Sequence, residues 1–208
     1  MPELANIKAL IFDLGGVIID LDQPATYRDF AYLSGKTMKE VQELAKDEHF
    51  FADYEMGKID DPTFRANIRE VLGILHSDEE IDAVWNAMIK SIKRERLAMI
   101  GELNQHYDCY VMSNTNDIHL RHIMRIGDYV APKGSFAGLF KQMYFSQELG
   151  VAKPDPAAWQ PILDDHGMAP ATALFIDDKL ENIEGAAKLG IQGYHNQNID
   201  DWMGLFSS

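Results

Sequence analysis

The sequence predicts an α/β fold, a doubly wound parallel sheet with helices on its faces and a helical bundle inserted after the first strand. Short apolar runs alternate with helical periodicity along most of the chain. The first run ends at Asp13 and is followed by Gly15-Gly16, as expected where a buried strand reaches the carboxyl edge of a sheet. The first and second runs are about 95 residues apart, too far for a single crossover helix.

Five apolar runs have the composition of strands, and each is short and bounded by polar or turn-forming residues. Their order along the chain favours parallel pairing, because helical segments separate most of them. The predicted strands are Ala9 to Phe12, Cys109 to Met112, Met143 to Phe145, Ala173 to Ile176, and Gln192 to His195.

The second half of the chain contains the helices expected to cover the sheet. A helix is predicted from Asp117 to Ile126, with a loop over residues 127–140. Asp155-Pro156 begins another helix, which Pro161 should kink or shorten. Lys179 to Leu189 is predicted as a helix that ends at a glycine.

Residues 23–93, called the helical insertion below, carry three helix-start patterns after a short first helix. Capping boxes and an Asp-Pro pair mark the starts, and apolar residues at helical spacing follow each. We therefore expect residues 1–22 and 94–208 to form the sheet domain and 23–93 a small helical bundle. The signals are a first helix at Thr26 to Leu33, Thr37 with Glu40, Asp61-Pro62 with Gly73 as a stop, and Ser77 with Glu80 before an apolar face reaching Ile92.

Composition narrows the classes of partner. The chain has 208 residues with 33 acidic and 19 basic side chains, a formal charge of −14. A field of this sign opposes nucleic acid and anionic membranes, so neither is an expected partner. The single cysteine, Cys109, lies in an apolar run and excludes a disulfide framework, which fits a reducing cytoplasm. No signal peptide or membrane-spanning run is predicted.

Four polar clusters follow predicted strands and should meet at one rim of the sheet. Alone, each has an ordinary structural explanation as a turn, a loop or a helix cap. Together, several carboxylates with one lysine and one hydroxyl make a costly cluster unless a cation and an anion bind there. The clusters are Asp13, Ser113-Asn114-Thr115-Asn116, Lys153 before Pro154, and Asp177-Asp178 with Asn182 one helical turn later.

These groups suit phosphoryl transfer through a covalent aspartyl phosphate. Asp13 would attack phosphorus, and Lys153 would neutralise both the carboxylate and the transferring group. Mg²⁺ would take oxygens from Asp13, the backbone carbonyl of Gly15 and Asp178. Ser113 and amides near Leu14 and Asn114 would hold the phosphoryl oxygens. Asp177 would be either a further metal ligand or a hydrogen-bond acceptor for Lys153.

The same residues resemble the haloacid dehalogenase superfamily of hydrolases over nearly the whole chain. The four motifs occur in order, and the insertion is similar to the type 1 cap of that family. Short stretches look closest to bacterial α-D-glucose-1-phosphatase-like members, among them Glu55-Met56-Gly57-Lys58-Ile59. The resemblance implies a Mg²⁺-dependent phosphatase of a small phosphorylated metabolite. The motifs are Phe12 to Val17, Val111 to Thr115, Lys153-Pro154, and Phe175 to Asp178 with Asn182 to Ala186.

One position departs from the family pattern. Phosphatases of the family usually carry a second aspartate two residues after the nucleophile as general acid and base, and here that position is Gly15. General acid catalysis is worth about a hundredfold to ten-thousandfold. A sugar 1-phosphate needs less protonation because its anomeric oxygen is a better leaving group than an ordinary alcohol. Asp20, Asp22 or Glu55 could supply the proton instead.

Two other functions stay open on the sequence. A 2-haloacid dehalogenase would use the aspartate, serine, lysine and asparagine without a metal, although the family's dehalogenases usually have an aromatic residue at the position of Gly15. A binding protein that lost activity with its acid group would keep affinity for Mg²⁺ and phosphate without turnover. His119, His122, Trp159 and Trp202 are expected to be packing or surface residues.

Overall fold

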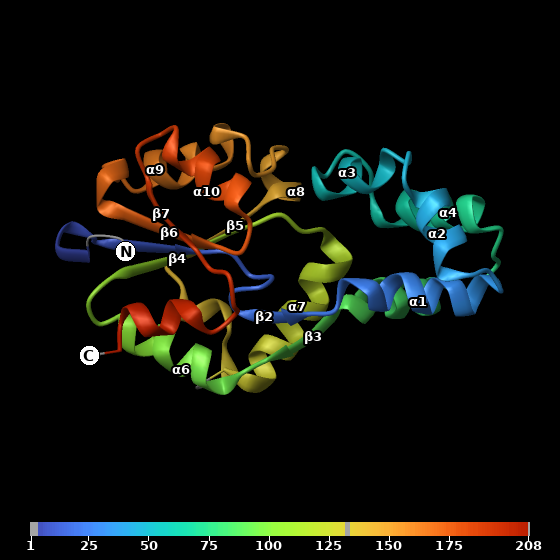
Figure 1. Cartoon of the computed structure of the whole chain (residues 1–208), viewed down its shortest axis with the longest axis horizontal. Helices are drawn as coiled ribbons and strands as arrows, with labels where there is room; N and C mark the ends of the chain where they lie inside the picture. Colours follow the sequence, from blue (N-terminus) through green and yellow to red (C-terminus); the bar gives the residue numbers. More distant parts are fainter. Residues whose placement is uncertain (1–3, 132–133, 208) are drawn as a thin grey trace.

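The computed structural model describes residues 4–131 and 134–207. Its centre is a five-stranded sheet in the order β5-β4-β1-β6-β7 (Figure 1). The four neighbouring pairs are all parallel. The predicted fold class is confirmed, and each predicted strand is present with ends shifted by at most one residue. The strands are β1 (Ala9–Phe12), β4 (Asp108–Ser113), β5 (Gln142–Phe145), β6 (Ala173–Asp177) and β7 (Gln192–His195).

Helices cover both faces of the sheet (Figure 1). Leu10 and Phe12 of β1 pack in one apolar cluster with α6 and α7, and Ala9 and Ile11 pack in a second with α9 and α10. β1 is buried on both faces, which explains why its sequence is apolar throughout instead of alternating. The helices of this part are α6 (Arg94–Leu103), α7 (Asp117–Val130), α8 (Ser146–Leu149), α9 (Gln160–Asp165) and α10 (Leu180–Ala187).

The helical insertion has an apolar core of its own, formed by residues that include Phe30, Phe64 and Ile81. Ile118 of α7 joins this core, so the insertion packs against the N-terminal turn of α7. The division of the chain into domains at residues 22 and 93 stays a prediction. The helices are α1 (Gln23–Ser34), α2 (Met38–Ala45), α3 (Phe50–Glu55), α4 (Asp61–Leu72) and α5 (Asp78–Trp85).

The predicted helix starts of the insertion are confirmed. Thr37 with Glu40 and Ser77 with Glu80 both form complete capping boxes, in which each side chain bonds to the other's backbone N–H. α4 begins at Asp61 and ends before Gly73, as predicted. Pro161 lies in the first turn of α9, and a 3-10 helix over Pro156–Ala158 precedes it, so the predicted shortening is confirmed.

The prediction that the last helix of the insertion reaches Ile92 is wrong. α5 ends at Trp85, and Ile89–Ile92 forms strand β3, antiparallel to β2 (Ile19–Leu21). Ile89 and Ile92 are three residues apart, which fits a helix face as well as a strand whose two middle residues are exposed. Pairing with β2 decides between them, and the two strands carry the chain into and out of the helices α1 to α5 (Figure 1).

Two further differences concern helices. α3 has no counterpart in the prediction, because its six residues are too few to show a helical period. α7 continues to Val130, so residues 127–130 are helical and the predicted loop is shorter. Residues 132 and 133 of that loop, like residues 1–3 and 208 of the predicted sheet domain, lie outside the described residues. No described helix has the length and apolar character that crossing a membrane requires.

Three successive backbone carbonyls after β1 accept hydrogen bonds from side chains distant in sequence. Asn196 Nδ2 donates to the oxygen of Gly16, Trp202 Nε1 to Val17 and Arg96 Nη1 to Ile18, each over 3.0 Å. Trp202 is fully buried, in agreement with its predicted packing role. The segment is irregular, so these three carbonyl groups have no partners in a helix or a sheet, and the side-chain donors supply the hydrogen bonds instead. The same bonds fix the backbone that follows Asp13.

Arg96 is the buried cation of this arrangement. Its side chain is fully buried, and its guanidinium pairs with Asp20 at 2.9 Å and Asp200 at 2.7 Å. It therefore links β2 and the segment after β7 to α6, and its fork of donors serves three acceptors at once.

We expect Arg96→Met to lower the free energy of unfolding by about 3 kcal/mol, because Asp20 and Asp200 each lose one of their partners and the buried carbonyl of Ile18 loses its donor. Arg94→Met is the matched control, since Arg94 lies on the same helix, carries the same charge and is exposed, and its effect should stay within about 0.5 kcal/mol. Urea unfolding of both variants measures the difference. Equal effects would show that net charge, and not this cluster, is responsible.

Candidate active site

The carboxyl ends of β1, β4 and β6 bring the predicted site residues together. A cavity of about 220 Å³ lies at this end of the sheet. The structure therefore assembles groups that are up to 165 positions apart, from Asp13 to Asp178. The residues predicted as nucleophile, phosphate-binding groups and principal metal ligands all line it: Asp13, Leu14, Gly15, Ser113, Asn114, Lys153 and Asp178.

A buried lysine joins the two aspartates at the centre of the site. Lys153 Nζ lies 2.9 Å from Asp13 Oδ1 and 2.7 Å from Asp177 Oδ2. It also donates to the carbonyl of Met112 over 2.9 Å. Burial alone would lower the pKa of Lys153, but the two carboxylates outweigh it and raise the pKa above its ordinary value. The lysine therefore stays charged.

Asp177 is fully buried, and both of its carboxylate oxygens accept hydrogen bonds from other groups of the protein. Besides Lys153, Asn182 Nδ2 bonds to both of its oxygens at 3.0 Å, and the backbone N–H of Lys179 bonds to Oδ1 at 2.8 Å. Of the two roles expected for Asp177, this pattern favours the acceptor that holds Lys153. Asn182 acts on Lys153 through Asp177.

Asn114 fixes the backbone of Lys153. The amide N–H of Lys153 donates to Asn114 Oδ1, and Asn114 Nδ2 donates to the carbonyl of Lys153, both over 2.9 Å. The pair of bonds imitates the pairing of two strands between segments that are 39 residues apart. Sequence reasoning expected only a backbone amide of this residue to act, so the positioning role of its side chain was missed.

Asp13 is nearly buried, with 8% of its surface exposed. Burial raises its pKa to about 6, and the charge of Asp177 adds to this, whereas the ion pair with Lys153 lowers the pKa. A carboxylate held in this environment is poorly solvated and has one oxygen engaged by the ammonium group. Such a group is a better nucleophile than an aspartate in water.

The carboxylates present suit a hard divalent cation. Asp13, Asp177 and Asp178 each offer an oxygen within 4.8 Å of the others. Burial and the neighbouring Asp177 raise the pKa of Asp178, which marks a place where a cation would relieve repulsion. Gly16 has φ of +70°, and a Cβ there would lie 2.6 Å from Asp178 Oδ2. The backbone and the carboxylate can approach this closely only at glycine.

The position of the absent second aspartate lies against a leucine. A Cβ on Gly15 would lie 2.7 Å from Leu21 Cδ1, so a side chain here would have to displace the end of this β2 side chain. Two of the three proposed substitutes are engaged elsewhere. Asp20 bonds to Arg96 and Ser91, and Asp22 pairs with Arg28 at 2.8 Å. These bonds lower the pKa of both groups, which makes them poor proton donors.

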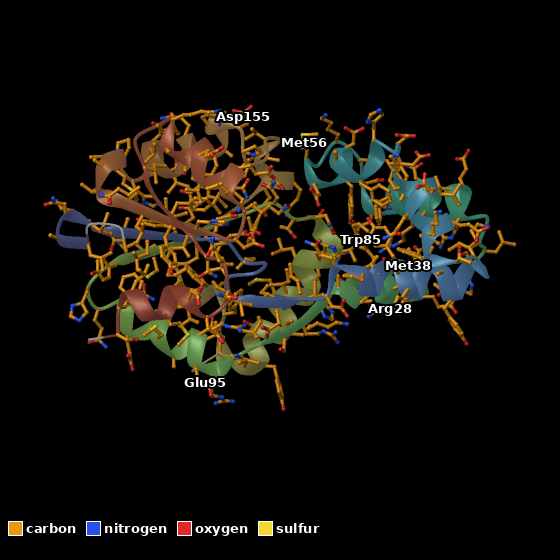
Figure 2. All side chains as sticks on the ribbon, in the orientation of Figure 1. Arg28, Met38, Met56, Trp85, Glu95 and Asp155 are labelled. Carbon is orange, nitrogen blue, oxygen red and sulfur yellow. The ribbon has the colours of Figure 1, made fainter. Side chains whose placement is uncertain are left out.

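Glu55 of α3 is the third candidate, and it does line the cavity of about 220 Å³ at the carboxyl ends of the strands, called the catalytic cavity below. Figure 2 shows Met56 and Trp85 where the insertion approaches the α/β part, close to the end of α3. Gln23, Trp85 and Met88 of the insertion line the cavity as well. No sequence pattern distinguishes these three residues, because apolar and aromatic residues at helical spacing also form the core of a bundle.

His119 is a packing residue, as expected, and it also lines the cavity. It is buried, lines the cavity and stacks on Trp85, with ring centroids 4.8 Å apart. Its Nδ1 lies 2.9 Å from Asn86 Oδ1, and burial lowers its pKa to about 3. The imidazole is therefore neutral near pH 7 and forms part of the cavity wall.

A second cavity of about 420 Å³ lies among the helices of the insertion. It shares Gln23, Glu55, Trp85 and Met88 with the catalytic cavity, so these four side chains form the wall between the two. The remaining lining is mostly apolar and includes Phe30, Val41, Phe51, Ile68 and Leu72.

Comparison with known proteins agrees with this architecture. A family model described as haloacid dehalogenase-like hydrolase matches residues 7–190. The chain is 27% identical over 201 residues to a D-ribitol-5-phosphate phosphatase of Bacteroides thetaiotaomicron, covering 94% of this chain and 95% of that one.

Solved structures of similar proteins cover almost the whole fold. A HAD family enzyme of Bacteroides thetaiotaomicron, in complex with magnesium and inorganic phosphate, has a TM-score of 0.89 at 33% identity, over 97% of this chain and 100% of that one. A predicted HAD-like family hydrolase of Porphyromonas gingivalis has a TM-score of 0.86 at 27% identity, over 97% of each chain. The chain belongs to the haloacid dehalogenase-like hydrolases.

The raised pKa of Asp13 predicts a gain in stability on its replacement. The pKa is about 6 in the metal-free folded chain, against an ordinary 3.8. Between these values the folded chain binds the proton more tightly, so the contribution of this group to stability falls as the pH rises. Asp13→Asn removes the effect, and Lys153 keeps Asp177 as its partner. In EDTA the variant should therefore unfold at a higher temperature than wild type above about pH 6.

Thermal unfolding of both proteins from about pH 4 to about pH 8 tests this, and the difference should shrink towards the acid end. Asp29→Asn, which neutralises an exposed aspartate, is the control and should show no such trend. A variant less stable than wild type near neutral pH would contradict the expectation.

Proposed function

We propose that this protein is a Mg²⁺-dependent phosphatase that hydrolyses a small phosphomonoester through an aspartyl phosphate on Asp13. The observation that carries the proposal is the buried ion pair of Asp13 with Lys153, next to Asp178, at the carboxyl ends of the strands. The phosphatase relative and the magnesium and phosphate complex of a similar structure support it.

The metal would be held by the carboxylates of Asp13 and Asp178 and the backbone carbonyl of Gly15. Oxygen donors of this kind suit Mg²⁺, which bound here would withdraw charge from the transferring phosphoryl group. Asp177 would not need to join the metal, because its oxygens already accept bonds from Lys153, Asn182 and the Lys179 amide.

The chain's own groups would bind and activate the phosphomonoester. Lys153 would hold Asp13 in place and stabilise the negative charge that passes from the carboxylate to the phosphoryl oxygens. The hydroxyl of Ser113 and the amides of Leu14 and Asn114, which border the cavity, would bind those oxygens. Because Asn114 fixes the backbone of Lys153, the ammonium group needs little reorganisation as charge develops.

A sugar or polyol phosphate is the proposed substrate class, and glucose 1-phosphate is one member of it. The ribitol-5-phosphate phosphatase relative supports a polyol phosphate. The catalytic cavity of about 220 Å³ is large enough for a phosphate with a small alcohol. The chain has a net charge of −14, which makes nucleic acid and anionic membranes poor partners. A cytoplasmic location fits the single buried cysteine of the chain.

The dehalogenase and the binding protein remain the alternatives. A metal-independent dehalogenase has no use for Asp178 beside Asp177, because burial and the charge of Asp177 both raise the pKa of Asp178 and make its ionised form costly. A protein that only binds phosphate and Mg²⁺ would show no turnover. Both alternatives therefore differ from the proposal in a measurable way.

Phosphate release from ribitol 5-phosphate and glucose 1-phosphate, with Mg²⁺ and with EDTA, tests the proposal. We expect turnover only with the metal. Asp13→Asn should lower kcat by at least about 10⁴-fold, because the nucleophile is lost. Asp178→Asn should raise the Mg²⁺ concentration for half-maximal rate by at least about tenfold.

Glu95→Gln serves as the control, because it removes one negative charge from an exposed side chain of α6, which Figure 2 shows at the lower edge of the molecule. Its activity should equal that of wild type. Full activity in EDTA, or an active Asp13→Asn variant, would overturn the proposal, and magnesium binding without turnover on a wide set of phosphomonoesters would favour the binding protein.

A further inference from the structure

The site as described lacks a group to protonate the leaving oxygen. Gly15 has no side chain, and the end of the Leu21 side chain lies next to it. Among the described residues that line the catalytic cavity, the carboxyl groups belong to Asp13, Asp178 and Glu55. The first is the proposed nucleophile and the second the proposed metal ligand, which leaves Glu55 for proton transfer.

Two neighbours of Glu55 in the chain fix its position over the cavity. The hydroxyl of Tyr54 accepts a hydrogen bond of 3.2 Å from the backbone N–H of Ile118, at the start of α7, and donates one of 2.5 Å to Asp61. Gly57 has φ of +66°, and a Cβ there would lie 2.1 Å from the carbonyl oxygen of Gln147 in α8. The end of α3 is therefore held against the α/β part on both sides of Glu55.

The carboxyl group of Glu55 is free for this role. Within residues 4–131 and 134–207, its side chain forms no hydrogen bond or ion pair at contact distance. It lies on the wall shared by the two cavities, where the alcohol part of a substrate would leave the phosphoryl group. Asp20 and Asp22, by contrast, are paired with arginines.

Two other ionisable groups that line the cavity, His119 and Lys153, do not fit the role. His119 is neutral near pH 7, with Nδ1 bonded to Asn86. Lys153 is held by Asp13 and Asp177. Burial raises the pKa of Glu55, and the exposed Lys179, the one charged neighbour that opposes this among the described residues, lowers it by less. The net effect favours a protonated carboxyl group at higher pH than an exposed glutamate allows.

We propose that Glu55 is the proton donor to the leaving alcohol and then the base that activates water, an inference that rests on the proposed function. In the first step, Asp13 Oδ forms a bond to phosphorus, the bond from phosphorus to the alcohol oxygen breaks, and that oxygen takes the proton of Glu55. In the second, water attacks phosphorus and gives its proton to the Glu55 carboxylate. The bond to Asp13 breaks, phosphate leaves, and both side chains return to their starting states.

Leaving groups of different basicity separate this role from a structural one. With Mg²⁺ at saturation, Glu55→Gln should lower kcat/KM for benzyl phosphate by about a hundredfold to ten-thousandfold. For 4-nitrophenyl phosphate, whose leaving group needs no proton, kcat/KM should fall by less than about tenfold. Loss of the base should also slow the second step, so a burst of nitrophenol should precede slow turnover.

Glu48→Gln is the matched control, because Glu48 lines the second cavity but not, among the described lining residues, the catalytic one. It should leave both substrates unaffected. Equal losses of Glu55→Gln on the two substrates, or no loss on benzyl phosphate, would overturn the assignment. A wild-type protein that hydrolyses neither substrate nor any other phosphomonoester would instead refute the proposed function.

A second variant tests the placement of Glu55 without changing its chemistry. Gly57→Ala puts a methyl group against the Gln147 carbonyl and must displace the end of α3. Gly73→Ala has the same backbone strain, with φ of +67°, but no atom within 4 Å of the added Cβ. Only Gly57→Ala should reduce the rate on benzyl phosphate more than that on 4-nitrophenyl phosphate, and the same ratio in both variants would contradict the proposed position.

Discussion

The site depends on the ion pairs that the ammonium group of Lys153 forms with Asp13 and Asp177. The ammonium group lies within 3 Å of two carboxylates that are both nearly or fully buried. Without it, two negative charges would share a region poor in water, and one of them would take up a proton. Asn114 bonds to the backbone of Lys153, and Asn182 bonds to the carboxylate of Asp177. Both bonds keep the ammonium group of Lys153 in place between the two carboxylates.

The sheet makes the arrangement possible at low entropic cost. β1, β4 and β6 are parallel neighbours, so Asp13, Ser113 and Asp177, which lie at the carboxyl ends of these strands, meet at the same edge of the sheet. Each is attached to a strand that is buried on both faces, which leaves the backbone little freedom. Rigid strands thus position groups that flexible loops would hold less accurately. The helical insertion adds the remaining wall of the cavity through α1, α3 and α5.

Prediction from sequence succeeded where a pattern had one physical meaning. The apolar run from Ala9 to Phe12 before an aspartate and glycines is typical of the end of a buried strand. The capping boxes at Thr37 and Ser77 mark the first residues of their helices. Prediction failed where two structures share one pattern. Ile89 and Ile92 fit a helix or a strand, and only their partner β2, about 70 residues earlier, decides. The side-chain roles of Asn114 and Trp85 depend on contacts that no local spacing encodes.

The segment after Asp13 is completed by residues from the other end of the sequence. The carbonyls of Gly16 and Val17 accept hydrogen bonds from Asn196 and Trp202, which are 180 and 185 positions later. During synthesis β1 leaves the ribosome well before these two donors, so the carbonyls of the segment after Asp13 stay without them until Asn196 and Trp202 have emerged. A chain that has been synthesised only as far as β7 therefore still lacks the donors for two carbonyls in the segment after Asp13.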